Sequence, residues 1–493
     1  MFRKVFVANR GEIAVRITRT LRELGVTAVA AYTEVDRGSL HVRSADEVVS
    51  LGHNPRAYLD AELLVDAARR SGCEALHPGY GFLSENAEFA ELCEARGLTF
   101  VGPPASAIRS MGSKERARAV MTKAGVPVVP GGPAGSLEEA RATADRIGYP
   151  VMVKATDGGG GKGMRLVTSP NDLESALERT RSEAEKAFGS GDVYLEKALI
   201  EPRHVEVQVL GDREGNVVHL FERDCSLQRR HQKIIEETPC PALDEATRAA
   251  LCDVALRGAR ALGYHSAGTF EFLLDRSGSF YFLEMNTRLQ VEHPITELVT
   301  GIDLVREMLR VAAGEPLPPE TWQARGAAIE ARVCAEDPAR GFAPSPGTIL
   351  HYLAPSGPFV REDGGIFAGA EVSPHYDPLL TKISVWAPDR ASALRRLHRA
   401  LGECVITGIA TNLALLERLL EDPDVQRGEY DTGFVERKRA ALTADEETAD
   451  AAAFAAAAAL AAEERRQERT AEPNEAGGLS PWVAADRAER FGR

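Results

Sequence analysis

The sequence has little of what marks a secreted, membrane-bound or nucleic-acid-binding protein. Its 493 residues include only seven cysteines, scattered without the paired spacing of a zinc site or a disulfide framework. No apolar stretch is long enough to span a membrane, and residues 1–4 lead into an expected strand and not into a secretory signal. The net charge of −14 argues against nucleic acid as the main partner. We therefore expect a cytoplasmic protein with reduced thiols and neither a membrane nor a nucleic-acid partner.

Two common nucleotide-binding fingerprints are missing as well. The loop at residues 8–12 follows the first expected strand but lacks G-x-G-x-x-G, and the glycine run at residues 157–163 (DGGGGKG) lacks Walker A spacing. Consecutive glycines still let backbone N–H groups close on phosphate oxygens. The run is either a surface hairpin or a flap over a nucleotide. Lys154, at the end of the preceding strand, favours the flap because it can reach α- and β-phosphates.

Residues 1–110 alternate between expected strands and helices. Apolar strands are expected at residues 4–8, 26–32, 75–76 and 99–101, and helices at residues 11–24 and 61–70. This βαβ order predicts a parallel, doubly wound, Rossmann-like sheet. A helical connection at residues 111–128 and a loop at residues 129–135, rich in proline and glycine, follow it.

The rest of the chain divides into a small domain, a larger domain and a tail. Residues 129–202 contain expected strands near 151–154, 164–167 and 193–196. Residues 203–440 mix strands and helices, which indicates a larger α+β domain. The tail at residues 441–493 includes a nearly pure alanine run, which predicts a helix or a disordered linker too weakly apolar for a membrane span.

Two glutamates in residues 268–286 carry the strongest chemical signal. Both halves of this segment alternate like strands, and residues 276–279 suit a four-residue hairpin loop. This register pairs Asp275 with Phe280 and places Glu271 directly opposite Glu284. Because opposed like charges destabilise a hairpin, a hard cation between the two carboxylates is the expected reason for them, and Mg²⁺ is the usual choice.

Polar residues continue at every second position after this glutamate. Wherever the chain stays extended, one face carries Glu284, Asn286, Arg288, Gln290 and Glu292. Phe280 and Phe282 are expected on the same face. The start of this face would then pack into a hydrophobic core, and its later residues would form a charged surface. The alternative is the solvated face of an edge strand.

Two polar segments have both a functional and a structural interpretation. In residues 202–209, His204, Glu206 and Gln208 share one face, which fits a binding face or an exposed sheet face. Residues 222–233 gather cationic donors in an acidic protein and suit small anions such as phosphate or bicarbonate, although a solvated loop is commoner.

Two further features favour a structural interpretation. Lys114 is either a phosphate ligand or the first residue of a helix, and the sequence alone favours the helix start. Residues 77–86 form a turn into a helix, with Ser84 as the expected cap.

These segments together resemble the biotin carboxylases, a branch of the ATP-grasp superfamily. The resemblance covers residues 1–440 in order and rests on residues 8–14 (ANRGEIA), 77–86, 157–163, 202–209, 228–233 (QRRHQK) and 284–294. It implies an α/β and α+β protein with the ATP-grasp fold. The implied parts are an N-terminal doubly wound domain (1–110), a helical linker (111–128), a small lid domain with the glycine flap (129–202) and a large C-terminal α+β domain (203–440).

The resemblance also implies roles for individual residues. The implied ATP contacts are Lys114, Lys154, Gly159, Gly160, Gly161, Glu196, Lys197, Leu199, His204, Gln228, His231, Glu271 and Glu284. Mg²⁺ or Mn²⁺ would be held by Glu271, Glu284 and Asn286. The residues implied to bind bicarbonate and biotin are Tyr80, Lys233, Arg288, Gln290, Val291, Glu292 and Arg332. The implied catalytic residues are Lys233, Arg288, Glu292, the base that deprotonates bicarbonate, and Arg332, which stabilises enolate-like biotin.

The activity that the resemblance implies is the ATP-dependent carboxylation of biotin through carboxyphosphate. Biotin enzymes carry biotin on a lysine flanked by methionines, and this sequence contains no Met-Lys dipeptide. We therefore expect a separate biotin carboxyl carrier protein. The resemblance also implies a carboxyltransferase subunit that selects the acyl-CoA, such as acetyl- or propionyl-CoA, and a homodimer. The alternatives are an ATP-grasp ligase that activates bicarbonate for an amine and a catalytically retired scaffold. Residues 288–292 and Arg332 argue against the first, and the complete set of carboxylates and lysines argues against the second.

Overall fold

The computed structural model describes residues 1–155, 164–188, 191–318 and 322–443, and residues 1–443 belong to one compact unit. The glycine flap and the tail from residue 444 therefore lie outside the described residues. Within the described part of the chain, no helix combines the length and the apolar character that crossing a membrane requires.

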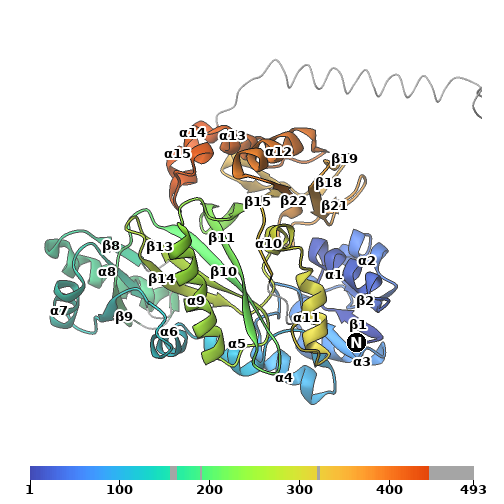
Figure 1. The fold of residues 1–493 in the computed structure, drawn as a ribbon, viewed down its shortest axis with the longest axis horizontal. Coiled ribbons are helices and arrows are strands. Elements are labelled where there is room, and N and C mark those ends of the chain that lie inside the picture. The colour runs from blue at the N-terminus through green and yellow to red at the C-terminus, as the bar shows by residue number, and fades with distance from the viewer. Residues whose placement is uncertain (156–163, 189–190, 319–321, 444–493) are drawn as a thin grey trace, which may run out of the picture. The chain divides into compact units, whose positions relative to one another are not determined.

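The N-terminal part is the parallel sheet that the sequence predicts (Figure 1). Its strand order is β3-β2-β1-β4-β5, with β1 Lys4–Val7, β2 Thr27–Tyr32, β3 Glu47–Ser50, β4 Ala75–His77 and β5 Thr99–Phe100. The helices are α1 Gly11–Glu23, α2 Leu40–Ser44, α3 Ala61–Arg70 and α4 Ala87–Ala95. The cap of α4 is Asn86, which accepts from the Phe89 amide, so the prediction of Ser84 as the cap is wrong.

A helical connection leads from this sheet into a small antiparallel domain. The connection contains α5 Ala105–Met111 and α6 Lys114–Lys123, so Lys114 does begin a helix. The four-stranded sheet has the order β6-β9-β7-β8, with β6 Gly131–Pro133, β7 Val151–Ala155, β8 Met164–Val167 and β9 Val193–Lys197, and the helices are α7 Leu137–Ile147 and α8 Leu173–Phe188. The loop expected at residues 129–135 is wrong at its centre, because β6 pairs there with β9.

The large domain is built on an eight-stranded antiparallel sheet with the order β14-β13-β10-β11-β12-β15-β22-β20. The strands are β10 Arg203–Gly211, β11 Val217–Arg229, β12 Gln232–Thr238, β13 Ser266–Leu274, β14 Phe280–Asn286, β15 Ala327–Cys334, β20 Val360–Gly364 and β22 Leu379–Ala387. Residues 222–233 thus form a hairpin of β11 and β12, so the loop alternative for this segment is wrong.

Helices and short strand pairs complete this domain. The helices are α9 Glu245–Ala261, α10 His293–Thr300, α11 Leu304–Ala312, α12 Arg390–Glu403, α13 Leu413–Glu421, α14 Pro423–Arg427 and α15 Phe434–Leu442. The short pairs are β16 Glu336–Asp337 with β17 Ala343–Pro344, β18 Gly347–Thr348 with β21 Glu371–Val372, and β19 His351–Leu353 with β23 Val405–Thr407.

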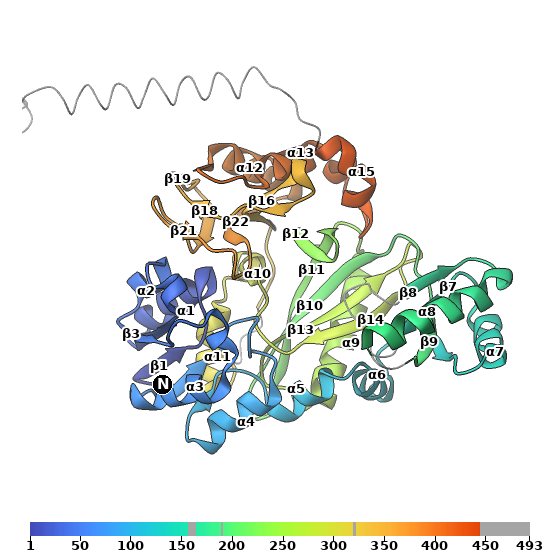
Figure 2. The same cartoon turned by 180° about the vertical axis from the view of Figure 1, so that it is seen from behind.

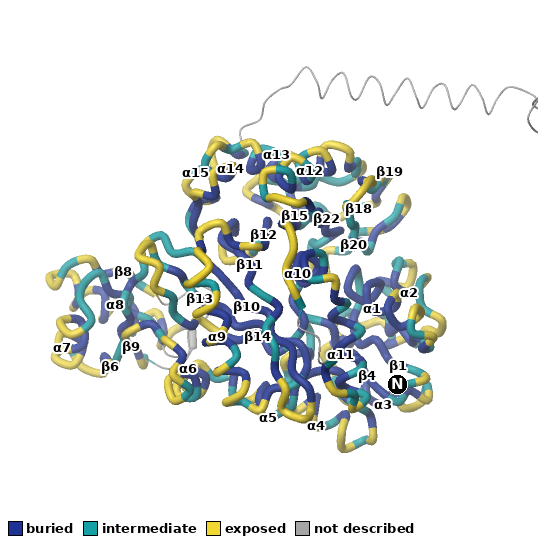
Figure 3. Tube along the Cα trace, viewed as in Figure 1, coloured by how far each residue is buried: buried dark blue, intermediate teal, exposed yellow. Residues whose placement is uncertain are grey.

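The two faces of strand β10 have opposite characters. Val205, Val207 and Val209 pack into a core with residues of α9, which lies in front of the sheet in Figure 1 and behind it in Figure 2. Figure 3 shows that the central strands are buried. His204 and Glu206 point from the other face and are also buried, so the exposed-face alternative for residues 202–209 is wrong.

The β13–β14 hairpin confirms the predicted pairing of the two carboxylates, although the strand register next to the loop differs from the predicted one. Glu271 is opposite Glu284, but Phe280 pairs with Leu274 and not with Asp275. A bulge between the pairs 271/284 and 272/282 inserts one extra residue, Leu283, and this restores the carboxylate register. The same bulge puts Phe280 and Phe282 in the core with Phe272, so their predicted position on the face of Glu284 is wrong.

Candidate active site

The charged face of the sheet carries a row of side chains from neighbouring strands. Glu206 on β10 lies in register with Glu271 on β13 and with Arg223 on β11, and Glu271 in turn faces Glu284 on β14. Glu206 and Arg223 are fully buried, and the Arg223 guanidinium lies 2.6 Å from Glu206. Burial of a charge is tolerated only with such partners, so the row is a network of compensated charges.

Lys233 on β12 joins three carboxylates of this face. Its ammonium lies 2.6 Å from Glu206, 2.8 Å from Glu271 and 2.7 Å from Glu292. Burial alone would lower the pKa of Lys233, but these carboxylates raise it well above its ordinary value. Lys233 therefore stays charged, and it is the electrostatic centre of the site.

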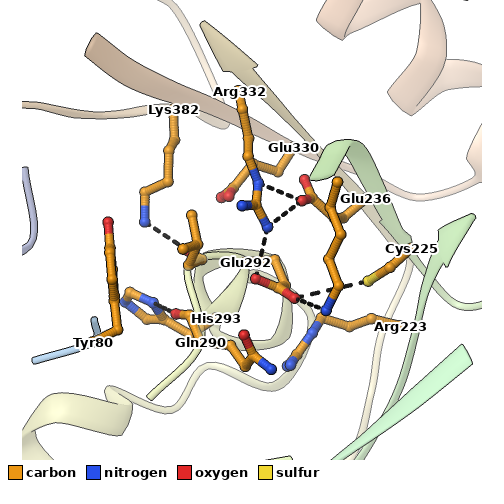
Figure 4. A network of polar contacts seen from close by, with 12 residues as sticks. Tyr80, Arg223, Cys225, Glu236, Gln290, Glu292, His293, Glu330, Arg332 and Lys382 are labelled. Atoms are coloured by element: carbon orange, nitrogen blue, oxygen red, sulfur yellow. Dashed lines mark hydrogen bonds and ion pairs between the residues drawn. The ribbon is translucent and has the colours of Figure 1, made fainter. Parts of the chain in front are cut away.

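Glu292 is bound by a cation at each oxygen. Lys233 contacts Oε1, and Arg332 on β15 contacts Oε2 at 2.9 Å (Figure 4). Glu292 immediately precedes α10, yet its side chain makes no capping hydrogen bond and is fully buried. Burial would raise the pKa of Glu292, but Lys233 and Arg332 hold it well below the ordinary value, so the carboxylate is ionised.

The backbone of the turn that carries Glu292 is fixed by two side chains. The His293 ring Nδ1 lies 2.7 Å from the Gln290 carbonyl, and Lys382 on β22 donates to the Val291 carbonyl at 2.7 Å. Lys382 also lies 3.2 Å from Glu12 of α1, which accepts a hydrogen bond from the Tyr80 hydroxyl. Tyr80 is therefore linked to the turn through contacts between the N-terminal and C-terminal parts of the chain.

Glu271 is contacted by three polar side chains besides Lys233. Asn286 donates to Oε1 at 2.8 Å, Gln290 donates to the same atom at 3.3 Å, and His204 Nε2 lies 3.0 Å from Oε2. Burial would raise the pKa of Glu271, but Lys233 and His204 lower it strongly.

The oxygen ligands at Glu271 and Glu284 fit a hard divalent cation. The accessible Glu284 carboxylate lies opposite Glu271, and partial burial and then the Glu271 charge raise its pKa. Ligand atoms of His204, Glu206 and Glu271 also lie within 4.8 Å of one another. Asn286 presents its amide nitrogen to Glu271, so its oxygen can bind a metal only after the amide turns.

Arg288 lies beside this carboxylate pair. Its guanidinium contacts Glu85 at 2.8 Å, the Asn286 Oδ1 at 3.0 Å and the Gln290 Oε1 at 3.0 Å. Strand β14 ends at Asn286, so the alternating residues that follow it do not share a strand face. The turn after the strand still brings Arg288, Gln290 and Glu292 into one network.

The expected ATP residues lie in several elements. In the four-stranded sheet, Lys154 of β7 pairs with Glu196 at 2.5 Å, and Lys197 of β9 donates to the carbonyls of Gly148 and Tyr149 at 3.0 and 2.9 Å. The half-buried Leu199 follows β9. Gln228 is buried opposite Lys233, His231 is exposed in the β11–β12 turn, and Lys114 begins α6. Gly159, Gly160 and Gly161 lie outside the described residues.

Sequence reasoning missed several residues that build the site. Glu236 and Lys382 have no predicted role. Glu12 and Arg223 enter the prediction only as members of residues 8–14 and 222–233, and Glu206 only through the face that it shares with His204 and Gln208. Glu236 accepts from Arg332 at 2.6 Å and is fully buried. The available signal was a single charge inside an apolar strand, as at Lys382 in residues 379–387.

Comparisons with known proteins agree with this architecture. Residues 1–108 match the model of the biotin carboxylase N-terminal domain, residues 113–320 that of the carbamoyl-phosphate synthase L chain ATP binding domain, and residues 330–437 that of the biotin carboxylase C-terminal domain. The fold and the site thus define a ligase of the ATP-grasp class. The chain belongs to the biotin carboxylase family.

Individual relatives are similar over nearly the whole described chain. A biotin carboxylase of Nostoc sp. is 50% identical over 88% of this chain and 99% of its own length. The mitochondrial methylcrotonoyl-CoA carboxylase subunit alpha of Oryza sativa is also 50% identical over 88% of this chain, which spans 60% of that protein.

Solved structures show the same likeness. The biotin carboxylase domain dimer of the Hydrogenobacter thermophilus 2-oxoglutarate carboxylase, in complex with MgADP, ADP and bicarbonate, is 47% identical. Its TM-score is 0.84, with 90% of this chain and 100% of that chain covered. Campylobacter jejuni biotin carboxylase, in a β-γ-ATP complex, is 45% identical with a TM-score of 0.83, and the match covers 89% of this chain and 99% of that one.

Proposed function

We propose that this chain catalyses the ATP- and Mg²⁺-dependent carboxylation of biotin by bicarbonate, with biotin held on a separate carrier protein. The observation that carries the proposal is Glu292, a buried carboxylate bound by Lys233 at 2.7 Å and by Arg332 at 2.9 Å. The nucleotide and bicarbonate in the Hydrogenobacter thermophilus structure support it.

Glu292 is the proposed base for bicarbonate. Its oxygens are held by two cations that a bicarbonate anion would also attract. An anion that draws Lys233 away from Glu292 makes this carboxylate more basic, because the cations are what lower its pKa. Glu292 then takes the bicarbonate proton while a bicarbonate oxygen attacks the γ-phosphorus and ADP leaves. Arg288, Gln290 and Val291 would orient the attacking anion.

Arg332 is the proposed partner of biotin. It lies on the opposite side of Glu292 from Lys233, and Glu236 fixes its Nε at 2.6 Å. A guanidinium anchored in this way can stabilise the negative charge that develops on the ureido oxygen of biotin, and the arginine side chain need not move to do so. Carboxyphosphate would split into CO₂ and phosphate, and the phosphate would take the ureido N–H proton of biotin. The deprotonated nitrogen would then form the N–C bond to CO₂ beside Arg332 and Tyr80, with water excluded.

The nucleotide and metal roles are proposals with specific structural requirements. Lys154 lies 2.5 Å from Glu196, so a phosphate would compete with this carboxylate for the ammonium. A magnesium ion bound by Glu271, Glu284 and Asn286 would neutralise phosphate charge. The other proposed ATP contacts are Lys114, Gly159, Gly160, Gly161, Glu196, Lys197, Leu199, His204, Gln228 and His231.

The domain division, the cellular location, the oligomeric state and the partner subunits are proposals as well. We propose a domain division at residues 110, 128, 202 and 440, which the family-model limits support near residue 110. We also propose a cytoplasmic homodimer that works with a biotin carboxyl carrier protein and a carboxyltransferase subunit. The acyl acceptor proposed is acetyl- or propionyl-CoA, with a place in fatty acid biosynthesis. The dimer in the Hydrogenobacter thermophilus structure supports the homodimer.

The test is to incubate the purified chain with MgATP, bicarbonate and biotin, and to follow ADP and carboxybiotin separately. Formation of both products that requires bicarbonate supports the proposal. The second candidate is a ligase that activates bicarbonate for an amine, and the matched carbamoyl-phosphate synthase ATP binding domain favours testing it. ATP cleavage that responds to ammonia but not to biotin would select that candidate instead.

A further inference from the structure

Two cations of neighbouring strands face the turn that carries Glu292. Arg332 on β15 and Lys382 on β22 are directly opposed in the antiparallel register. Opposed like charges destabilise a strand pair, and Lys382 is fully buried as well. Arg332 is explained by its contact with the Glu292 carboxylate, whereas nothing in the proposed chemistry uses Lys382.

The contacts of Lys382 indicate what it does. Its ammonium donates to the Val291 carbonyl at 2.7 Å and lies 3.2 Å from Glu12. Figure 4 shows that Lys382 lies on the side of Glu292 where Tyr80 lies. Burial alone would lower the pKa of Lys382, but Glu12 and Glu330 raise it, so the ammonium stays charged.

The Val291 carbonyl belongs to the peptide that supplies the Glu292 amide. The preceding peptide, which supplies the Val291 amide, is fixed in the same way, because its Gln290 carbonyl is bound by the His293 ring at 2.7 Å. Neither of these two amides donates to another backbone group among the described residues. Lys382 and His293 therefore fix the two adjacent peptides that carry these N–H groups, directly before Glu292 in the chain.

We propose that Lys382 is a positioning residue that couples the bicarbonate turn to the biotin side of the site. Through Val291 it fixes the backbone that presents Glu292, and through Glu12 it is tied to Tyr80. This inference rests on the proposed function and deepens it. The ion pair joins β22 to α1, so a displacement of Tyr80 by an incoming biotin is transmitted to the turn.

The principal test is Lys382→Met in the full chain, with ADP and carboxybiotin measured separately. We expect the KM for bicarbonate to rise about tenfold or more, because a freed peptide no longer presents its amide, while the KM for ATP changes less than twofold. We also expect more ADP per carboxybiotin, since ATP cleavage is no longer tied to the biotin side. Lys382→Arg keeps a donor and should restore part of both properties.

A second variant separates positioning from simple stabilisation. Lys382→Met leaves the Glu12 carboxylate buried without its partner, which destabilises the fold. Lys382→Met/Glu12→Gln removes that charge and should regain thermal stability while keeping the raised KM for bicarbonate. If the double variant regains both stability and the wild-type KM, Lys382 is only structural and the inference is wrong.

The failure of the inference is distinguishable from failure of the proposed function. Wild-type protein that makes no carboxybiotin would overturn the proposed function. Wild-type protein that makes carboxybiotin, beside a Lys382→Met variant with unchanged KM and an unchanged ratio of ADP to carboxybiotin, would overturn the inference alone.

Discussion

Removal of the Lys233 ammonium is the sharpest test of the electrostatics of the site. Lys233→Met keeps a side chain of similar length and removes the charge. Glu206, Glu271 and Glu292, which now lie 2.6, 2.8 and 2.7 Å from the ammonium, would then repel one another in a buried environment. Breaking a buried ion pair by removing one partner typically costs about 3–5 kcal/mol, and we expect a loss of unfolding free energy of this size at pH 8.

The sign of the pH dependence follows from the lowered pKa values. Lys233 helps to hold the pKa of Glu271 and Glu292 below 4.5, the ordinary value of a glutamate. Such groups add stability above the unfolded pKa, and this stability is lost as the pH falls through the lower folded pKa. The variant lacks most of this contribution. The difference in stability between wild type and Lys233→Met should therefore be largest above about pH 5 and should shrink toward pH 3.

Two assays and one control decide the outcome. Urea unfolding at several pH values gives the stability difference. ADP release in the presence of bicarbonate should fall about a hundredfold or more, because the attacking anion loses a cation. The control is Lys438→Met. Lys438 is 35% exposed and pairs with Asp422 at 2.8 Å and Asp424 at 2.6 Å, so its loss should cost about 1 kcal/mol and spare turnover. A stability loss independent of pH, or wild-type turnover in Lys233→Met, would refute the reasoning.

Three further predictions address the metal, the two half-reactions and the carrier. Glu284→Gln should abolish magnesium-dependent ATP cleavage while circular dichroism shows an intact fold, and unchanged turnover would exclude this metal site. Arg332→Ala should keep part of its bicarbonate-dependent ADP release but lose carboxybiotin formation, whereas Glu292→Ala should lose both. Equal loss of both products in the two variants would contradict this division of labour. After co-expression with a biotin ligase, intact-mass analysis should find no biotin on this chain, and an added biotin mass would show that the carrier is not separate.

The sequence predicted the fold wherever local pattern and tertiary structure agree. The parallel N-terminal sheet, strand β8 and helix α3 were predicted within a residue or two, because buried strands and amphipathic helices have distinct periods. The short strands β3 and β6 were missed. β3 has a largely exposed burial pattern, and β6 consists of glycine and proline, so neither carries the apolar alternation that identifies a strand.

The candidate site was predictable where charges lie close together in sequence. Glu271 and Glu284 belong to one hairpin, and the residues around Glu292 follow it directly. The contact between Arg332 and Glu292 joins residues 40 positions apart, one on β15 and one directly before α10, and no local pattern brings them together. The contact between Lys382 and Glu12 depends on the packing of β22 against α1, elements that lie more than 350 residues apart in the chain, so no local pattern predicts it.

Directly opposed like charges in a strand pair indicate a compensating ligand or counter-charge, but they can be recognised only once the strand register is known. For β13 and β14 the hairpin loop suggested the register, and the carboxylate pair was found although the bulge at Leu283 changed the pairing of the loop. For β15 and β22 the connecting chain is long, so the opposition of Arg332 and Lys382 became visible only in the structure. In the first pair the accessible Glu284 leaves room for a cation. In the second pair each cation already has a carboxylate partner, Glu292 for Arg332 and Glu12 for Lys382. This pair therefore positions protein groups and does not require a ligand to compensate its charges.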